Sequence, residues 1–194
     1  FLVILLFRKR IFYCCKSGFW RSLTTGTGEA GQQSGIFICK LVLMISSELI
    51  NSHWAPKAEQ LGRLTPEMLD LIYREKWFKL FVPKEFGGLG LTLPEALLLE
   101  EKIARLDASM GWTVTLCAGA GWFVGFLDER ISQSIFSNAK VCLAGSGFVG
   151  GKANWTDNFY EISGSWTYAS GALHATHFTA NCELYEEGKA LLDE

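Results

Sequence analysis

Apolar and polar positions after residue 47 follow the spacing of amphipathic helices. The residues Thr65-Pro66-Glu67 combine a threonine suited to an N-cap with a proline suited to a first helical turn. The pattern therefore predicts a helix from residue 65 to about residue 77, preceded by another over about residues 48–61. The apolar face of the helix that begins at residue 65 consists of Met68, Leu69, Ile72 and Tyr73.

More helices are predicted further along the chain. Residues 83–90, PKEFGGLG, begin with a proline and contain three glycines, which indicates a loop. Thr92-Leu93-Pro94-Glu95 matches a capping box, and its apolar positions continue to Leu106. Asp107 is a candidate cap for residues 110–126, whose apolar residues lie all round and predict a helix buried on several faces. A short amphipathic helix is predicted over residues 128–136.

The pattern changes at Lys140. Short alternating runs separated by Gly, Ser, Asn and Asp are typical of antiparallel strands, and they lie near residues 141–151, 159–162, 166–169 and 178–184. The predicted fold class is therefore α+β, with a helical-bundle domain over residues 44–139 and a partial antiparallel β-sandwich or barrel over residues 140–194. Because three or four strands are too few to close a barrel, we interpret the chain as a fragment.

Residues 1–43 differ from the rest in charge. They hold six Lys or Arg and one acidic residue, whereas residues 44–194 hold twelve and nineteen. The apolar run 1–7 is much shorter than the roughly 20 residues of a membrane span, and its basic cluster follows the run, unlike that of a signal peptide. We interpret residues 1–43 as a non-native or disordered leader, with the natural start at Met44; a genuine targeting extension is the alternative.

Charge and cysteine content narrow the class of protein. The net charge is -2, and the acidic main body argues against a nucleic-acid surface. No membrane span is expected. The six cysteines lie in the leader or singly in apolar runs, which fits reduced, buried thiols of a cytoplasmic protein.

Two histidines and a cysteine near the end of the chain are candidate metal ligands. His174 and His177 are three apart in a stretch that favours turn and strand, where such residues point to opposite faces. Only Cys182 is available nearby as a third ligand, so we expect no metal. A hydrolase is also disfavoured, since Gly145-Ser146-Gly147 lacks the spacing of a nucleophile elbow.

The glycines of residues 145–151 are a second candidate for chemistry. They satisfy a G-x-G-x-x-G string, but more strand follows them, so a classical dinucleotide site is not expected. The run predicts either a loop with flexible turns or a place where the backbone comes close to a flat ligand.

Three stretches together resemble the acyl-CoA dehydrogenase family of flavoproteins. They are WFKLFVPKEFGGLG (77–90), EEKIARLDASMGW (100–112) and GSWTYASGALHA (164–175), and the resemblance covers about residues 47–185. It implies a helical N-terminal domain, a β middle domain and a C-terminal four-helix domain that is absent here. It also implies FAD, with FMN possible, between the middle and C-terminal domains, and a homo-oligomer when complete.

The resemblance implies cofactor-binding residues but no catalytic ones. Leu143 and Ser146 would contact the flavin from a first strand, and Tyr168 and Ser170 from a second. The family's catalytic base, a carboxylate, normally lies in the C-terminal domain. The catalytic residues are therefore unknown, and this fragment is expected to bind flavin poorly and to be inactive alone.

The main functional expectation from the resemblance is acyl-CoA dehydrogenation with hydride transfer to flavin N5, served by an electron-transfer partner. Two departures from the family's pattern affect the expected contacts to flavin and substrate: Gly145-Ser146-Gly147 replaces Thr-Glu-Pro, and Trp166 replaces Lys. The pattern Trp-x-Tyr-Ala-Ser-Gly is similar to a branch of flavin-dependent monooxygenases, which would imply an aromatic substrate and a flavin reductase. A non-catalytic helical interaction module is the remaining alternative.

Overall fold

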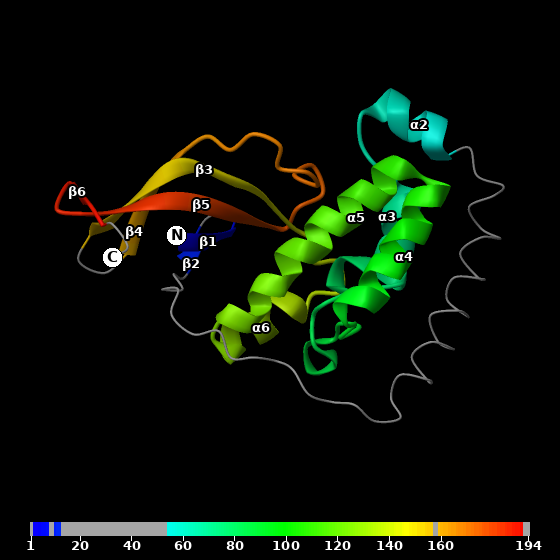
Figure 1. Ribbon diagram of the computed structural model, residues 1–194, viewed down its shortest axis with the longest axis horizontal. Helices are drawn as coiled ribbons and strands as arrows, with labels where there is room; N and C mark the ends of the chain where they lie inside the picture. Colours follow the sequence, from blue (N-terminus) through cyan, green and yellow to red (C-terminus); the bar gives the residue numbers. More distant parts are fainter. Residues whose placement is uncertain (1, 8–9, 13–53, 157–158, 192–194) are drawn as a thin grey trace.

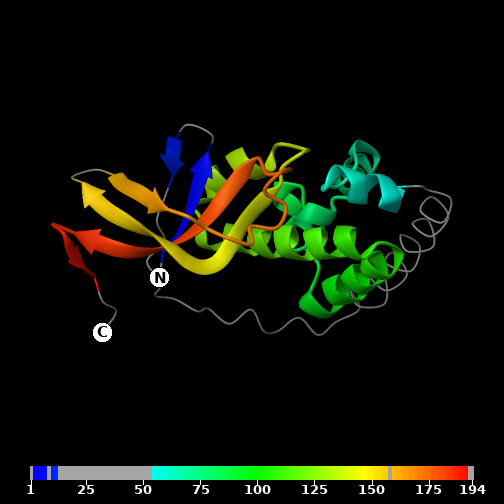
Figure 2. The same cartoon turned by 90° about the horizontal axis from the view of Figure 1, so that it is seen from above.

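The computed structural model describes residues 2–7, 10–12, 54–156 and 159–191, and it has a helical part beside a twisted sheet (Figures 1 and 2). The helices are α2 (Trp54–Leu61), α3 (Pro66–Arg74), α4 (Leu93–Leu106), α5 (Ala108–Gly121) and α6 (Glu129–Phe136). Short 3-10 helices lie at Trp77–Lys79, Lys84–Phe86 and Trp122–Phe126. The predicted α+β class is confirmed.

The helix starts lie where the sequence predicts them. Thr65 accepts a hydrogen bond from the Met68 backbone N–H through its side chain, at 3.3 Å, and caps α3. Thr92 and Glu95 form the capping box of α4. The Asp107 carboxylate accepts from the Met110 N–H at 2.7 Å and caps α5. The predicted buried helix over residues 110–126 changes to a 3-10 helix after Gly121.

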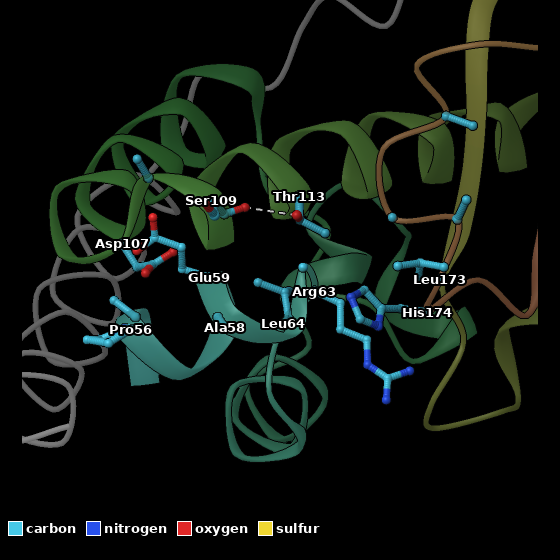
Figure 3. A pocket seen from close by; sticks show the side chains of 16 residues that line it. Pro56, Ala58, Glu59, Arg63, Leu64, Asp107, Ser109, Thr113, Leu173 and His174 are labelled. Atoms are coloured by element: carbon cyan, nitrogen blue, oxygen red, sulfur yellow. Dashed lines mark hydrogen bonds between the residues drawn. The ribbon is translucent and has the colours of Figure 1, made fainter. Parts of the chain in front are cut away.

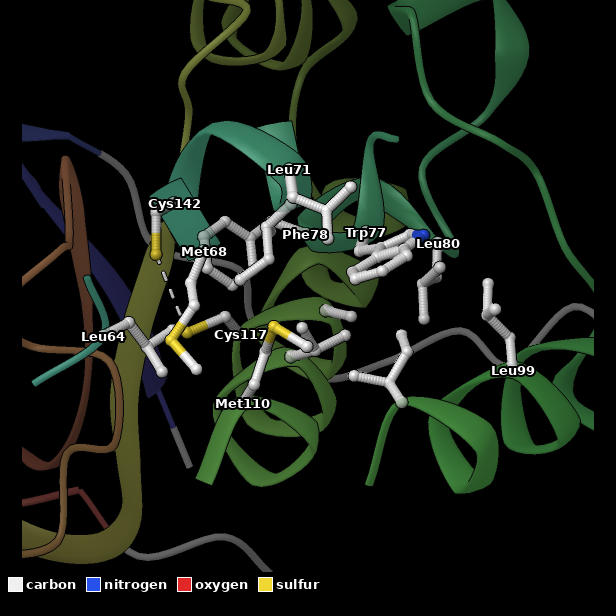
Figure 4. Packing of buried hydrophobic residues seen from close by; sticks show 14 of the residues in the cluster. Leu64, Met68, Leu71, Trp77, Phe78, Leu80, Leu99, Met110, Cys117 and Cys142 are labelled. Carbon is white, nitrogen blue, oxygen red and sulfur yellow. Dashed lines mark hydrogen bonds between the residues drawn. The ribbon is translucent and has the colours of Figure 1, made fainter. Parts of the chain in front are cut away.

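The core of the helical part lies between α3, α4 and α5 (Figure 4). Helices α4 and α5 approach closely because Gly111 has no side chain, so its backbone lies directly against Ala104. The described cysteines are buried, as predicted, and the sulfurs of Cys117 on α5 and Cys142 before the sheet are 3.6 Å apart. The core therefore extends from the helices to the first residues of the β part.

The sheet has the strand order β2-β1-β5-β3-β4, and β6 pairs with β5. Its strands are β1 (Leu2–Phe7), β2 (Arg10–Phe12), β3 (Leu143–Thr156), β4 (Phe159–Gly164), β5 (His177–Glu186) and β6 (Lys189–Ala190). One pairing differs from the predicted antiparallel arrangement: β3 and β5 are parallel. After β4 reverses the chain, residues 165–176 return it to the start of β3, where the Thr176 N–H donates to the Cys142 carbonyl at 2.9 Å.

Two short segments of the predicted leader pair with the sheet. Strand β1 runs antiparallel to β5, with Leu2 opposite Cys182 and Phe7 opposite His177, and β2 pairs with β1. The interpretation of residues 1–43 as a non-native or disordered leader stays a prediction. The predicted start at Met44 lies outside the described residues and stays a prediction.

The predicted strand over residues 166–169 is wrong, because residues 165–176 form a loop. Tyr168 has a left-handed backbone (φ 58°) and Gly171 another (φ 84°), and neither is compatible with a continuous strand. The Trp166 indole leaves the loop, lies beside Gly151 and Gly164, and donates its N–H to the Asn181 carbonyl at 2.8 Å. This side chain anchors the loop to the sheet, and the anchoring replaces strand pairing.

Candidate functional site

The loop formed by residues 165–176 lies against helix α5, and its best-defined contact involves Ser170. The Trp112 indole N–H donates to the Ser170 hydroxyl oxygen at 3.0 Å, and the Cys117 thiol donates to the Ser170 carbonyl at 3.8 Å. Gly171 follows with a positive φ, and a side chain there would overlap the Cys117 sulfur. The helical part therefore holds the position of Ser170.

Two exposed aromatic residues lie near Ser170: Trp112, which bonds to its hydroxyl, and Tyr168, two positions earlier in the chain. Tyr168 is 92% exposed and Trp112 is 61% exposed. The Ser170 N–H donates to the Tyr168 carbonyl at 2.9 Å, so the backbone turns tightly between these two residues. Because Ser170 accepts from Trp112, its own O–H is left to donate to a ligand. These residues fit the edge and face of a flat, polar-edged ring such as a flavin.

The two residues predicted on the first strand differ in their surroundings. Ser146 is half-buried on β3, just before an irregularity in the β3–β5 register, and its hydroxyl accepts from the Phe148 N–H at 3.2 Å. Leu143 is buried and belongs to a hydrophobic cluster with Val82 and Ile135. The Leu143 side chain thus packs in the core, which makes it the least suited of the four predicted residues to touch a cofactor.

The glycines of β3 have a partner within the chain itself. A side chain at Gly151 would overlap the Trp166 ring, and a Cβ at Gly150 would lie 3.1 Å from Trp166 Cδ1. The flat group that approaches this backbone is therefore the Trp166 indole. The close approach predicted from the glycines exists, but a protein side chain accounts for it.

A cavity of about 730 Å³ lies beside the same loop, between α2 with the turn after it, the start of α5 and residues 169–174 (Figure 3). Leu64, Ala169 and Leu173 give it an apolar wall. Figure 3 shows Glu59 and Asp107 on one side of the cavity and Arg63 and His174 on the other. The cavity thus has an acidic end and a basic end.

The two histidines have different roles. Burial and the nearby Arg63 guanidinium lower the pKa of His174, which lines the cavity. His177 is buried at the first residue of β5, as the sequence predicts, with Nδ1 2.8 Å from the Thr176 hydroxyl, and burial lowers its pKa. Among the described residues, no three His, Cys, Asp or Glu side chains are grouped so that they could hold a metal ion.

Sequence reasoning missed Trp112 and the basic end of the cavity. Helix α5 is apolar nearly all round, so its pattern contains no signal that one of its aromatic residues is exposed and bonded to a distant loop. Arg63 lies in a turn with no motif. The contact between Trp112 and Ser170 spans 58 residues and arises only in the folded chain.

A helical domain that holds a loop carrying exposed aromatic and hydroxyl groups, followed by an open sheet, is the arrangement expected for the N-terminal half of a flavoprotein of the acyl-CoA dehydrogenase type. The comparison with protein families confirms this class: residues 44–126 match the family described as acyl-CoA dehydrogenase, N-terminal domain. This match lies in the helical domain and covers less than half of the chain.

Individual relatives refine the comparison. The chain is 34% identical over 109 residues to a pigment production hydroxylase of Rhodococcus sp. (strain ATCC 21145), covering 56% of this chain and 28% of the relative. It is 25% identical over 122 residues to the oxygenase component of an FADH(2)-dependent resorcinol hydroxylase of Rhizobium sp. (strain MTP-10005), covering 62% and 30%. The chain thus spans less than a third of the length of these two curated relatives.

A solved structure shows the same fold. XiaF from Streptomyces sp., in complex with FADH2 and glycerol, superimposes with a TM-score of 0.76 at 18% identity, covering 83% of this chain and 41% of XiaF. At this identity the match establishes the fold.

Of the helices in the described part of the chain, none is long and apolar enough to cross a membrane.

Proposed function

We propose that this chain is the N-terminal part of the oxygenase component of a two-component flavin-dependent monooxygenase that hydroxylates an aromatic compound. The observation that carries the proposal is the Ser170 hydroxyl, held by the Trp112 N–H at 3.0 Å and left with its own proton to donate. This group lies where the family resemblance implies a flavin. The exposed Tyr168 and Trp112 rings add flat apolar surface beside it.

The residues of this chain would bind and orient the cofactor. The Ser170 O–H would donate to a polar edge of the ring system, and Trp112 would keep that hydroxyl from rotating away. Tyr168 would cover part of a ring face, and Ser146 would contribute from β3. When bound, reduced flavin supplies the electrons with which molecular oxygen is activated for hydroxylation.

Hydroxylation is favoured over acyl-CoA dehydrogenation, the main expectation from the sequence resemblance. The two curated relatives described above are named as hydroxylases, and one is named as FADH(2)-dependent and as an oxygenase component. The Trp-x-Tyr-Ala-Ser-Gly pattern of residues 166–171 is similar to the same branch. The proposal implies a separate flavin reductase as partner, in place of an electron-transfer partner that accepts electrons.

An anaerobic titration distinguishes the two functions. The natural protein that contains this chain would be titrated with FADH2 and, separately, with oxidised FAD. Binding would be followed by tryptophan fluorescence, because Trp112 lies at the proposed site. The monooxygenase proposal expects tighter binding of FADH2 than of FAD. In a separate assay with molecular oxygen, a flavin reductase and NADH, it expects phenol hydroxylation by the same protein. Reduction of a dye acceptor by acyl-CoA with no hydroxylation would refute it.

A variant tests the assigned position of the flavin. Ser170→Leu replaces the hydroxyl with a branched apolar side chain beside Trp112 and should reduce flavin retention. Ser134→Leu, an exposed serine on α6, makes the same change away from the site. Equal flavin occupancy in both variants would show that the ring does not lie at Ser170.

A further inference from the structure

The cavity beside residues 169–174 has features of a ligand site that the family assignment does not explain. Its volume of about 730 Å³ lies within the roughly 300–1,000 Å³ of typical small-molecule pockets. It is formed by segments far apart in sequence: α2 and the turn after it, the start of α5, and the loop (Figure 3). Leu173 lines the cavity and is 70% exposed, so a large apolar side chain is left uncovered there.

The basic end of the cavity consists of Arg63 and His174. Figure 3 shows the His174 imidazole beside the Arg63 side chain, and burial together with the Arg63 charge lowers the pKa of His174. The ion pairs formed among residues 54–156 and 159–191 do not include Arg63. Two donor groups that repel each other when both are charged are stabilised by an anion placed between them.

The acidic end of the cavity restricts the ligand further. Asp107 already accepts the Met110 N–H at 2.7 Å, whereas Glu59 is exposed at the cavity wall. These two carboxylates disfavour a dianion such as phosphate, and Glu59 favours a ligand with a hydrogen-bond donor at that end. The walls between the two ends are apolar, through Leu64 and Ala169.

We propose that this cavity binds a small organic carboxylate, with its acid group between Arg63 and His174, its apolar body against Leu64 and Leu173, and a phenol or amine donor at Glu59. Arg63 is the principal specificity residue because its planar, permanently charged fork matches a carboxylate. The inference goes beyond the proposed function, since it concerns binding in the absence of flavin. If the proposed function also holds, the carboxylate belongs to the class of its aromatic substrate.

The test uses the 194-residue chain without flavin. The probe is 4′-hydroxybiphenyl-4-carboxylate, which carries a phenol and an acid at opposite ends of a rigid apolar body, and its control is the corresponding primary carboxamide. Isothermal titration calorimetry measures the dissociation constant of each. The proposal expects the acid to bind about tenfold or more tightly than the amide, the effect of one charge-assisted hydrogen bond.

Two variants and one competitor complete the design. Arg63→Gln should weaken binding of the acid about tenfold and remove the preference for acid over amide, whereas Arg130→Gln, the same change on α6, should alter neither. His174→Gln should weaken the acid to a smaller extent, and thermal midpoints confirm that each variant is folded. Three results would each overturn the proposal. They are equal binding of the acid and the amide, an affinity of the Arg63→Gln variant for the acid equal to that of the original chain, and displacement of the acid by inorganic phosphate at comparable concentration. Binding of the acid by this chain, together with no phenol hydroxylation by the natural protein that contains it, would contradict the proposed function alone.

Discussion

Gly111 permits the contact between α4 and α5 on which the position of Trp112 depends. A Cβ built on Gly111 would lie 2.5 Å from Ala104 Cα, 2.6 Å from its Cβ and 2.8 Å from its N. Carbon atoms in contact prefer roughly 3.5–4.0 Å, and two of the three obstructing atoms are backbone, so no side-chain rotation relieves the overlap. Gly111→Ala therefore forces the two helices apart by on the order of 1 Å.

Gly119 on the same helix is the matched control, because a Cβ there meets nothing within 4 Å. Both substitutions gain the helix propensity of alanine over glycine, about 1 kcal/mol. Only Gly111→Ala adds overpacking, which costs about 1–3 kcal/mol. The difference in free energy of unfolding between the two variants isolates the steric cost and is expected to be about 1–3 kcal/mol.

Thermal unfolding followed by circular dichroism measures this difference. For a chain of this size, about 1 kcal/mol shifts the midpoint by roughly 2–4 °C, so Gly111→Ala should melt roughly 2–12 °C below Gly119→Ala. Gly111→Ala should also change the fluorescence of Trp112, whose indole N–H is held by Ser170. Equal midpoints for the two variants would refute the close crossing of α4 and α5.

Three further predictions concern two buried charged side chains and the contact between Gly151 and Trp166. Burial raises the pKa of Glu100 above its ordinary 4.5. The contribution of Glu100 to the free energy of unfolding therefore falls as the pH rises from 4.5 through the raised pKa of the folded state. Glu100→Gln should flatten the pH dependence of the urea midpoint and stabilise the chain at pH 7. Lys79 donates to the carbonyls of Phe136 and Asn138 at 2.7 and 3.0 Å. Lys79→Met should therefore lower the free energy of unfolding, measured by urea titration, by about 2–3 kcal/mol. An unchanged free energy of unfolding would show that the two carbonyls bind water instead. Gly151→Ala should displace the Trp166 ring, seen as a shift of its indole N–H resonance, whereas Gly147→Ala should not.

The helical domain could be predicted from sequence because its signals are local. The caps at Thr65, Thr92 and Asp107 each act over three residues, and a single sequence shows both partners. The strand pairing could not be predicted in the same way. Whether β3 and β5 run parallel depends on the path of residues 165–176, and that path depends on where the Trp166 indole docks. The periodicity of apolar residues does not show that the Trp166 side chain packs against glycines of the sheet.

The candidate site shows the same division. The resemblance identified the segment that contains Tyr168 and Ser170, but it could not show that Tyr168 is exposed in a left-handed turn or that Leu143 packs in the core. The search for metal ligands singled out His174 for its spacing to His177. In the structure, His174 instead lies near Arg63, which is 111 positions earlier in the sequence, and both side chains line a cavity.

The loop of residues 165–176 connects the two proposed sites. Ser170 bonds to Trp112 on one side, whereas Ala169, Gly171 and the residues after them line the cavity. The backbone at Gly171 has little freedom. Its φ is positive, and any side chain at this position would overlap Cys117, so the loop can approach α5 in this way only with glycine here. A carboxylate in the cavity and a flavin at Ser170 would therefore contact neighbouring residues of one rigid loop. Because linkage is reciprocal, any effect of the acid on flavin affinity must equal the effect of flavin on the affinity for the acid, which ties the two binding measurements to each other.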